Sequence, residues 1–385
     1  MPKYRLLTPG PVAVPETIRL AMSETLLHHR APAFLPLLQE VRAGLKQVFQ
    51  TQRDVLILAS SGTGAMEAAV ANVLDRGQTA VVVRGGKFGE RWQEICAAYG
   101  VATECVDVEW GSAVEPSAVR AAFARAPGAA ALLVQASETS TGVYHPIRDL
   151  CELVHERPGR MIVVDGISGV GVHDLPMDDW GIDVLVSGSQ KSWLLPPGLA
   201  FIALSERAEK AVQRTSNPRF YFDLRKELEG QRDNQTAWTP AVSLIVGLRE
   251  ALRLILGEGL PKVLARHRAL AEATRAAMQS LGLRLLAPDS PSYACTAVWV
   301  PEGVSGKALV KQLRDRYAVT VAGGQGHLET SIFRIGHMGD LDAFDMITAV
   351  AAVEMALADL GCPVKLGEGV RTAEEMLREL CAGET

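Results

Sequence analysis

The sequence has 385 residues, which is long enough for a large domain followed by a smaller one. Hydrophobic residues make up 48% of it and charged residues 22%, so a sizeable buried core is feasible and the composition argues against wholesale disorder. The net charge of −5 argues against the polybasic surface with which proteins bind nucleic acid or acidic membranes.

The spacing of the cysteines and the lengths of the apolar runs indicate the cellular compartment of the protein. The cysteines show no C-x-x-C spacing, so we expect reduced thiols and neither a disulfide framework nor a metal site. No N-terminal run is apolar enough for a signal peptide, and no later segment approaches the roughly 18 apolar residues of a membrane span. We therefore expect a cytoplasmic protein with no membrane partner. The six cysteines are Cys96, Cys105, Cys151, Cys295, Cys362 and Cys381.

After an N-terminal arm, residues 1–17, short β-branched runs alternate with helical patterns through the first two thirds of the chain. The first four runs are almost continuously apolar, as is typical of a parallel sheet that helices cover on both faces. This alternation predicts an α/β domain, in which ligands bind beyond the carboxyl ends of the strands. The expected strands are 55–59, 79–84, 131–135, 161–165 and 184–187, and the helices between them include 65–74 and 116–126.

From about residue 240 the pattern changes to that of an α+β domain. We expect a large domain at 18–245 and a small C-terminal domain at 246–385. In the tail, Thr372-Ala-Glu-Glu375 fits the capping box that begins many helices. The small-domain helices are expected at 242–256, 264–281, 306–316 and 341–360, and its strands at 293–300 and 331–335.

Lys191 and Asp165 each follow a predicted strand of the large domain. Lys191 lies in Ser187-Gly-Ser-Gln-Lys-Ser192, and taken alone this position favours a solvated loop lysine. Asp165 ends a wholly apolar strand, and because an unpaired buried charge is costly, this carboxylate must find a partner. A protonated pyridine nitrogen is such a partner, with a lysine forming the Schiff base. Alone, Asp165 is equally a helix cap or turn carboxylate; metal ligation is disfavoured because no His or Cys cluster accompanies it.

A third element, Ala59-Ser-Ser-Gly-Thr-Gly-Ala-Met-Glu67, runs from a strand through glycines into an alanine-rich helix. Glycines let the backbone approach a ligand, and the helix N-terminus offers free N–H groups to a phosphate. The segment is neither a P-loop nor a dinucleotide fingerprint. Ser61 or Thr63 could equally serve only to cap the helix.

In this order and spacing, the three elements resemble the class V aminotransferases, within the pyridoxal 5′-phosphate (PLP) fold of the aspartate aminotransferase type. The nearest likeness is to the alanine–glyoxylate and serine–pyruvate aminotransferases, and it covers nearly the whole chain. The motifs that carry it are Leu7-Thr-Pro-Gly-Pro-Val12, Ser61-Gly-Thr-Gly-Ala-Met-Glu-Ala-Ala69, Glu138-Thr-Ser-Thr-Gly-Val143, Val164-Asp-Gly-Ile-Ser168, Ser187-Gly-Ser-Gln-Lys191 and Phe333-Arg-Ile-Gly336.

The resemblance implies a role for each matching position. Lys191 would be the Schiff-base lysine and proton shuttle, and Asp165 the partner of the pyridine nitrogen. Phe88 would stack on the cofactor ring, and Arg334 would bind the substrate carboxylate through the fixed fork of its guanidinium. Further cofactor contacts are implied for Ser61, Gly62, Thr63 and Gln190 at the phosphate, Thr139 at the ring hydroxyl, and Thr239 at the phosphate of a neighbouring subunit. Thr236 stands where relatives carry tyrosine, and we leave His28, His29 and Arg30 without a role.

The implied activity is ping-pong transamination by a homodimer with shared active sites. The amino donor would be a small L-amino acid of the alanine, serine or aspartate class, and the acceptor a 2-oxo acid such as glyoxylate or pyruvate. One rival is a PLP lyase, such as a cysteine desulfurase or a kynureninase-like hydrolase. A desulfurase needs a mobile cysteine, which segment 321–327 lacks, while Cys295 lies in an apolar strand pattern. The other rival is a non-enzymatic subunit associated with hydrogenases.

Overall fold

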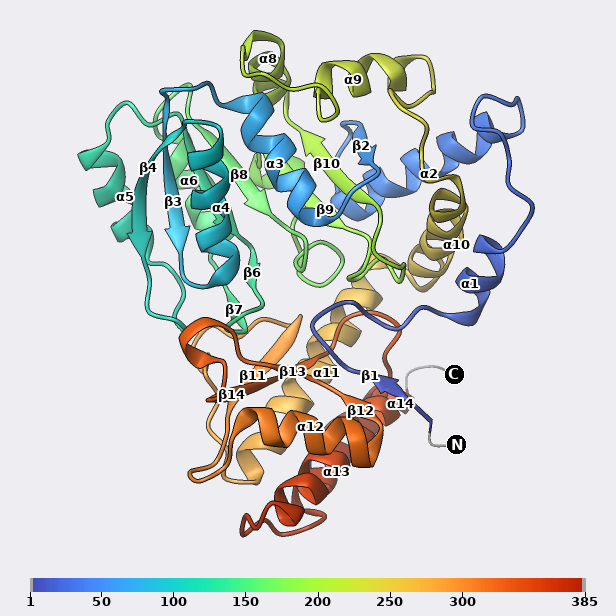
Figure 1. Cartoon of the computed structure of the whole chain (residues 1–385), viewed down its shortest axis with the longest axis vertical. Coiled ribbons are helices and arrows are strands. Elements are labelled where there is room, and N and C mark those ends of the chain that lie inside the picture. Colours follow the sequence, from blue (N-terminus) through green and yellow to red (C-terminus); the bar gives the residue numbers. More distant parts are fainter. Residues whose placement is uncertain (1–2, 383–385) are drawn as a thin grey trace.

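The computed structural model describes residues 3–382, and for residues 379–382 it describes the backbone only. A large domain built on one sheet lies above a smaller domain in Figure 1. The N-terminal segment, in blue, lies beside the small domain before the chain enters the large one. None of the described helices is both long and apolar enough to cross a membrane.

The large domain is built on a seven-stranded sheet in the order β2-β10-β9-β8-β5-β3-β4. All neighbouring strands are parallel except β10, which runs antiparallel to both β9 and β2. This mostly parallel sheet confirms the predicted α/β class. The strands are β2 (Val55–Leu58), β3 (Thr79–Arg84), β4 (Ala102–Asp107), β5 (Ala131–Gln135), β8 (Met161–Asp165), β9 (Val184–Gly188) and β10 (Ala200–Leu204).

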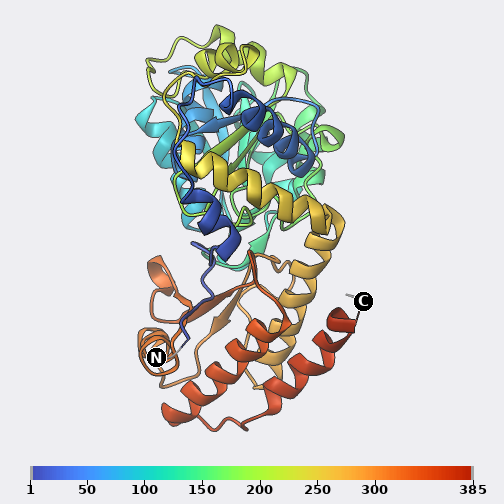
Figure 2. The same cartoon turned by 90° about the vertical axis from the view of Figure 1, so that its right-hand side faces the viewer.

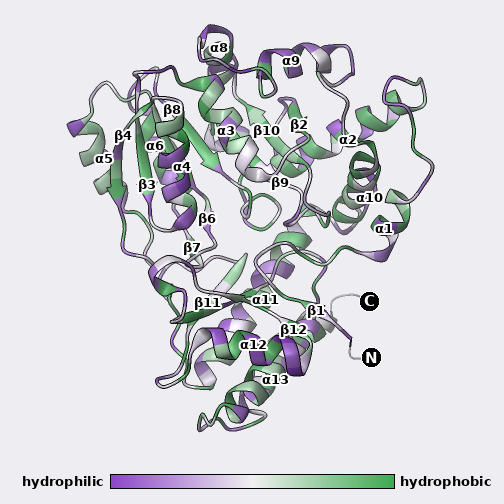
Figure 3. Cartoon of the chain, viewed as in Figure 1, coloured by the Kyte–Doolittle hydropathy of each residue, from purple (hydrophilic) through white to green (hydrophobic). Residues whose placement is uncertain are grey.

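Helices cover both faces of this sheet, as the apolar strands predicted. Alternate side chains of β2 enter different cores: Val55 and Ile57 pack in one, Leu56 and Leu58 in the other. Figure 3 shows most strands of the sheet as largely hydrophobic, whereas the helices carry hydrophilic segments. The first core is covered by α2 (Phe34–Phe49), α5 (Pro116–Arg125), α6 (Ile147–His155) and α10 (Val242–Glu258), and the second by α3 (Gly62–Val73), α4 (Lys87–Ala98) and α8 (Glu206–Arg214).

The small domain has a core of its own between a three-stranded antiparallel sheet, in the order β11-β14-β13, and four helices. Helix α10 packs against α2 in the large domain and leads into α11, which packs against α14 in the small one (Figure 2). The expected boundary at 245 falls inside α10. The elements are β11 (Cys295–Trp299), β13 (Ala322–Gly323), β14 (Ile332–Gly336), α11 (Leu260–Ser280), α12 (Gly306–Tyr317), α13 (Ala343–Asp359) and α14 (Glu368–Ala382).

The N-terminal arm joins the small domain to the large one. Strand β1 (Arg5–Leu6) pairs in parallel with β12 (Val319–Thr320). The Gly336 N–H then donates to the Leu7 carbonyl at 2.7 Å, and the Val12 N–H donates to the Gln190 carbonyl at 3.2 Å. Helix α1 (Glu16–Met22) follows and packs on α10.

The capping box expected at Thr372 is wrong. Helix α14 begins at Glu368, so Thr372 lies in its interior and its hydroxyl donates to the Glu368 carbonyl at 3.0 Å. A capping box does occur at α13, where Asp342 and Asp345 each accept from the other's backbone N–H. The remaining short elements are β6 (Ser137–Glu138), β7 (Val143–Tyr144), α7 (Met177–Trp180), α9 (Leu224–Arg232) and η1 (Gly326–Leu328).

The described cysteines carry free thiols, as expected for Cys96, Cys105, Cys151, Cys295 and Cys362. The side chain of Cys381 lies outside the described part of the chain.

Candidate active site

Asp165 and Lys191 come together at the carboxyl ends of the neighbouring strands β8 and β9. Asp165 is 5% exposed and accepts a hydrogen bond from the Ile167 N–H at 2.8 Å. Burial raises the pKa of Asp165 to about 7. Lys191 is 8% exposed, donates to the Pro9 carbonyl of the N-terminal arm, and has its pKa lowered to about 8 by burial.

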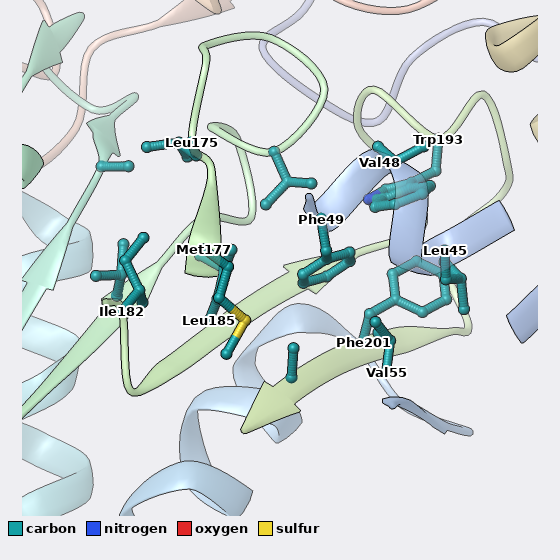
Figure 4. Packing of buried hydrophobic residues seen from close by; sticks show 14 of the residues in the cluster. Leu45, Val48, Phe49, Val55, Leu175, Met177, Ile182, Leu185, Trp193 and Phe201 are labelled. Carbon is teal, nitrogen blue, oxygen red and sulfur yellow. The ribbon is translucent and has the colours of Figure 1, made fainter. Parts of the chain in front are cut away.

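The loop that carries Lys191 is anchored in the core by Trp193. The indole packs with Phe49 and Phe201 in one cluster (Figure 4). Its ring centroid lies 5.7 Å from that of Phe49 and 4.8 Å from that of Phe201. Its N–H donates to the Ser187 hydroxyl at 2.8 Å, at the end of β9. Because Trp193 is fixed by packing and a hydrogen bond, the lysine two residues earlier has little freedom of position.

The glycine-rich segment forms the N-terminus of α3 beside Asp165. Gly62 and Thr63 are the first residues of the helix, so their N–H groups have no intrahelical acceptor. The Ser61 side chain makes no capping bond, which leaves its hydroxyl free for the cavity. A Cβ atom on Gly62 would lie 2.5 Å from the Ile167 side chain, so a larger residue here would have to displace that side chain.

These groups surround one cavity of about 190 Å³ at the strand ends. Its wall contains every large-domain site residue expected from the sequence apart from Thr239. Arg91, Ser137, Ile167 and Ser168 also line it, although sequence analysis gave them no role. The expected residues in the wall are Ser61, Gly62, Thr63, Phe88, Thr139, Asp165, Gln190 and Lys191.

Glu138 is a further residue that the sequence interpretation missed. Its buried carboxylate accepts from the N–H groups of Phe88 and Gly89, at 3.1 and 3.0 Å, in the first turn of α4. The Ser140 N–H and hydroxyl donate to its other oxygen at 3.2 and 2.6 Å. Burial raises the pKa of Glu138, while these hydrogen bonds act in the opposite direction. A lone acidic residue in a run of small and apolar residues was the available signal.

Arg334, on β14, lies beside the cavity and not in its wall. It is 6% exposed, and its guanidinium donates to the carbonyls of Thr139 at 2.7 Å and Gly323 at 2.9 Å. The Cys295 thiol also points at the Thr139 carbonyl, at 3.6 Å. The small domain therefore presents a guanidinium directly behind one wall residue of the cavity.

Thr239 lies away from this cavity within the same chain. It lines a separate pocket with Thr236, Trp238 and Glu227. Burial raises the pKa of Glu227 to about 7, and its carboxylate accepts from the Ala237 N–H at 3.2 Å. The 28–30 segment lies elsewhere on the surface, where Arg30 donates to the Gln235 side chain at 3.3 Å.

Comparison with known proteins identifies the family. The model of the class V aminotransferases ("Aminotransferase class-V") matches residues 20–338, which is most of the chain. The chain belongs to this family. It is 41% identical to the "Soluble hydrogenase, small subunit" of Synechococcus sp. (97% of this chain, 98% of the relative) and 36% identical to the "L-aspartate--glyoxylate aminotransferase" of Paracoccus denitrificans (98% and 97%). The solved structure of the pyridoxamine–pyruvate aminotransferase from Mesorhizobium loti matches with a TM-score of 0.93 and 29% identity, over 98% of both chains.

Class V aminotransferases depend on PLP, and the cavity residues fit that cofactor. The free N–H groups at the start of α3 suit its phosphate, and the buried Asp165 suits its ring nitrogen. The side-chain oxygen of Gln190 is buried and has no hydrogen-bond partner among the described residues, so it can still accept a hydrogen bond from a donor on a ligand.

Proposed function

We propose that this class V aminotransferase transfers the amino group of a small L-amino acid to a 2-oxo acid such as glyoxylate or pyruvate, by a ping-pong mechanism. The observation that carries the proposal is the pairing of Lys191 and Asp165 in one cavity with the N-terminus of α3. Bound there, PLP supplies an electron sink for negative charge that develops on a substrate carbon.

The chain's own residues would divide the remaining work. Asp165 would keep a proton on the cofactor's ring nitrogen, and Phe88 would hold the ring from one face. Lys191 would move a proton away from the substrate α-carbon, and burial helps because it lowers the pKa of this amine to about 8, nearer to neutrality. Thr139 would contact the ring hydroxyl, and Arg334 the substrate carboxylate.

We further propose that two copies of the chain assemble so that Thr239 of each reaches the phosphate site of the other. The support is an aromatic cluster beside Thr239 that the single chain leaves uncovered. Phe220 is 71% exposed and Tyr221 44% exposed, and both contact Trp238. An exposed apolar cluster of this kind is typical of an interface.

A desulfurase activity is less well supported, because Cys295, whose thiol lies beside the Thr139 carbonyl in the cavity wall, is held within β11. Burial raises the pKa of its thiol to about 11, whereas a nucleophilic cysteine needs a lowered value and freedom to move. The hydrogenase name of one relative applies to that protein, and the intact pair of Lys191 and Asp165 favours an enzyme here.

The test is an assay of the purified protein with a panel of amino donors against glyoxylate and pyruvate. We expect keto acid formation from at least one of alanine, serine and aspartate, and an absorption band of lysine-bound PLP that Lys191→Ala loses. An unchanged borohydride-reducible adduct in that variant would refute the role of Lys191. Absence of transamination with every donor, in protein that carries the cofactor, would refute the proposed reaction.

A further inference from the structure

Arg91 lies in the wall of the cavity, one helical turn after Phe88 on α4. Its guanidinium carbon lies 5.0 Å from the centroid of the Phe88 ring, within the range of a cation–π contact. One guanidinium N–H donates to the Thr63 hydroxyl at 3.1 Å. The side chain is thus directed from α4 toward the N-terminus of α3.

The charge of Arg91 has no carboxylate partner among the described residues. Glu90, its acidic neighbour on α4, pairs with Lys87 instead. Arg91 is half-buried, and a guanidinium in such a position favours an anion beside it. The cavity supplies Asp165 as its acidic wall residue, but the Arg91 hydrogen bond points to Thr63.

The groups expected around the cofactor phosphate are all neutral: Ser61, Gly62, Thr63 and Gln190. A phosphate monoester carries about −1.5 to −2 charges at neutral pH, so neutral donors leave its charge uncompensated. Among the described wall residues the cations are Lys191 and Arg91. Lys191 is hydrogen-bonded to the Pro9 carbonyl, and its proposed role is at the reacting carbon of the substrate. Arg91 is then the remaining cation of the described wall that can compensate the charge of the phosphate.

We infer that Arg91 is the cation that binds the phosphate of PLP and that it also orients the Thr63 hydroxyl toward the same group. This inference rests on the proposed function. The Thr63 oxygen accepts the hydrogen bond from Arg91, so its own proton is free to be donated to a phosphate oxygen. The contact with Phe88 keeps the guanidinium in place while the first turn of α3 contributes its N–H groups.

The test compares binding of PLP with binding of pyridoxal, which lacks the phosphate, to the cofactor-free protein by tryptophan fluorescence and absorbance. Arg91→Gln should weaken PLP binding roughly 10- to 150-fold, the range for a hydrogen bond to a charged group. Pyridoxal binding should change less than about threefold, because no charged contact is lost. The affinity of Arg91→Lys for PLP should lie between those of Arg91→Gln and the unsubstituted protein, since lysine keeps the charge but lacks the planar guanidinium.

Arg120→Gln is the matched control, because Arg120 is exposed and pairs with Glu156 on the surface. It should leave both affinities unchanged, and circular dichroism should show all variants folded. Equal losses for PLP and pyridoxal, or no loss for either, would overturn the inference.

Rates of the half-reactions with aspartate and with alanine, measured at saturating PLP, test whether Arg91 binds a second substrate carboxylate instead. If Arg91→Gln slowed aspartate but spared alanine, and PLP affinity were unchanged, Arg91 would bind a second substrate carboxylate instead of the phosphate. If the unsubstituted protein failed to bind PLP at all, the proposed function itself would fail. The two failures are therefore distinguishable.

Discussion

At the scale of single residues, burial shifts the pKa values of the two central groups of the cavity toward neutrality, from opposite sides. Burial raises the pKa of Asp165 to about 7 and lowers that of Lys191 to about 8. In each case the neutral form is stabilised. A cofactor that offers Asp165 a positive ring nitrogen would restore the charged carboxylate at low cost.

The raised pKa of Asp165 predicts a pH dependence of stability in the cofactor-free protein. The folded state binds this proton more tightly than the unfolded chain, so the stabilisation is complete below about pH 4 and is lost as pH rises through about 7. Asp165→Asn should remove this pH-dependent contribution to the free energy of unfolding, because an amide does not titrate. We expect the stability difference between the variant and the unsubstituted protein to grow in the variant's favour from pH 4 to 7, measured by urea unfolding. A difference independent of pH would contradict the shift.

With PLP bound, the same substitution should act in the opposite direction. Asp165→Asn cannot balance a proton on the ring nitrogen, so transamination should fall by at least about two orders of magnitude. Activity within a few-fold of that of the unsubstituted enzyme would refute the pairing of Asp165 with the ring nitrogen.

Arg334 leads to a prediction about substrate recognition. Arg334→Ala should lower catalytic efficiency with amino acids by about two to three orders of magnitude, the usual cost of truncating one partner of a desolvated charged pair. Arg334→Lys should recover only part of this catalytic efficiency, because lysine lacks the planar guanidinium that binds a carboxylate through two N–H groups. The control is the amine that lacks the carboxylate, which should react equally in all three proteins. Equal losses for both substrates would mean that Arg334 supports the Thr139 backbone instead.

At the scale of elements, Glu138 links β6 to the first turn of α4, and this helix carries both Phe88 and Arg91. Glu138→Gln replaces one accepting oxygen by an NH2 group that faces N–H or O–H donors. We expect a loss of about 1–3 kcal/mol in unfolding free energy and weaker binding of both PLP and pyridoxal, because ring stacking is disturbed. Glu156→Gln, at an exposed ion pair, is the control and should change neither. Unaltered stability and cofactor affinity would refute the positioning role of Glu138.

The helices and strands also show how much of the structure could be predicted from the sequence. The apolar strands of the sheet were predicted, β2, β3, β5, β8 and β9 within one or two residues of their observed ends. Strand β4 was missed because its edge position leaves it polar and half exposed, and β10 because a short apolar run does not distinguish strand from helix. Eight of the large-domain residues that line the cavity were singled out because each follows a predicted strand or matches a motif. Glu138 and Arg91 were not, because their roles depend on contacts between α4, β6 and α3.

At the scale of the whole molecule, the role proposed for Thr239 at the phosphate requires a second copy, because Thr239 lies outside the cavity of its own chain. We expect a dimer in sedimentation. Phe220→Arg should shift it toward monomer and weaken PLP binding, since the new charge lies beside Lys226, 4.3 Å from the Phe220 ring. Phe344→Arg is the matched control, because Phe344 is equally exposed, at 69%, but lies on α13 of the small domain. A fully active monomer would exclude the shared site.

The N-terminal arm has a consequence for biosynthesis. Arg5 pairs with Val319, so the arm waits during synthesis for a partner that is made more than three hundred residues later. At the usual rate of elongation this delay is on the order of tens of seconds. During that time the large domain can fold around its strands, but Lys191 lacks the Pro9 carbonyl held by the docked arm. The arm can dock beside Lys191 only after β12 has been made, so a nascent chain should remain inactive until the small domain has been translated.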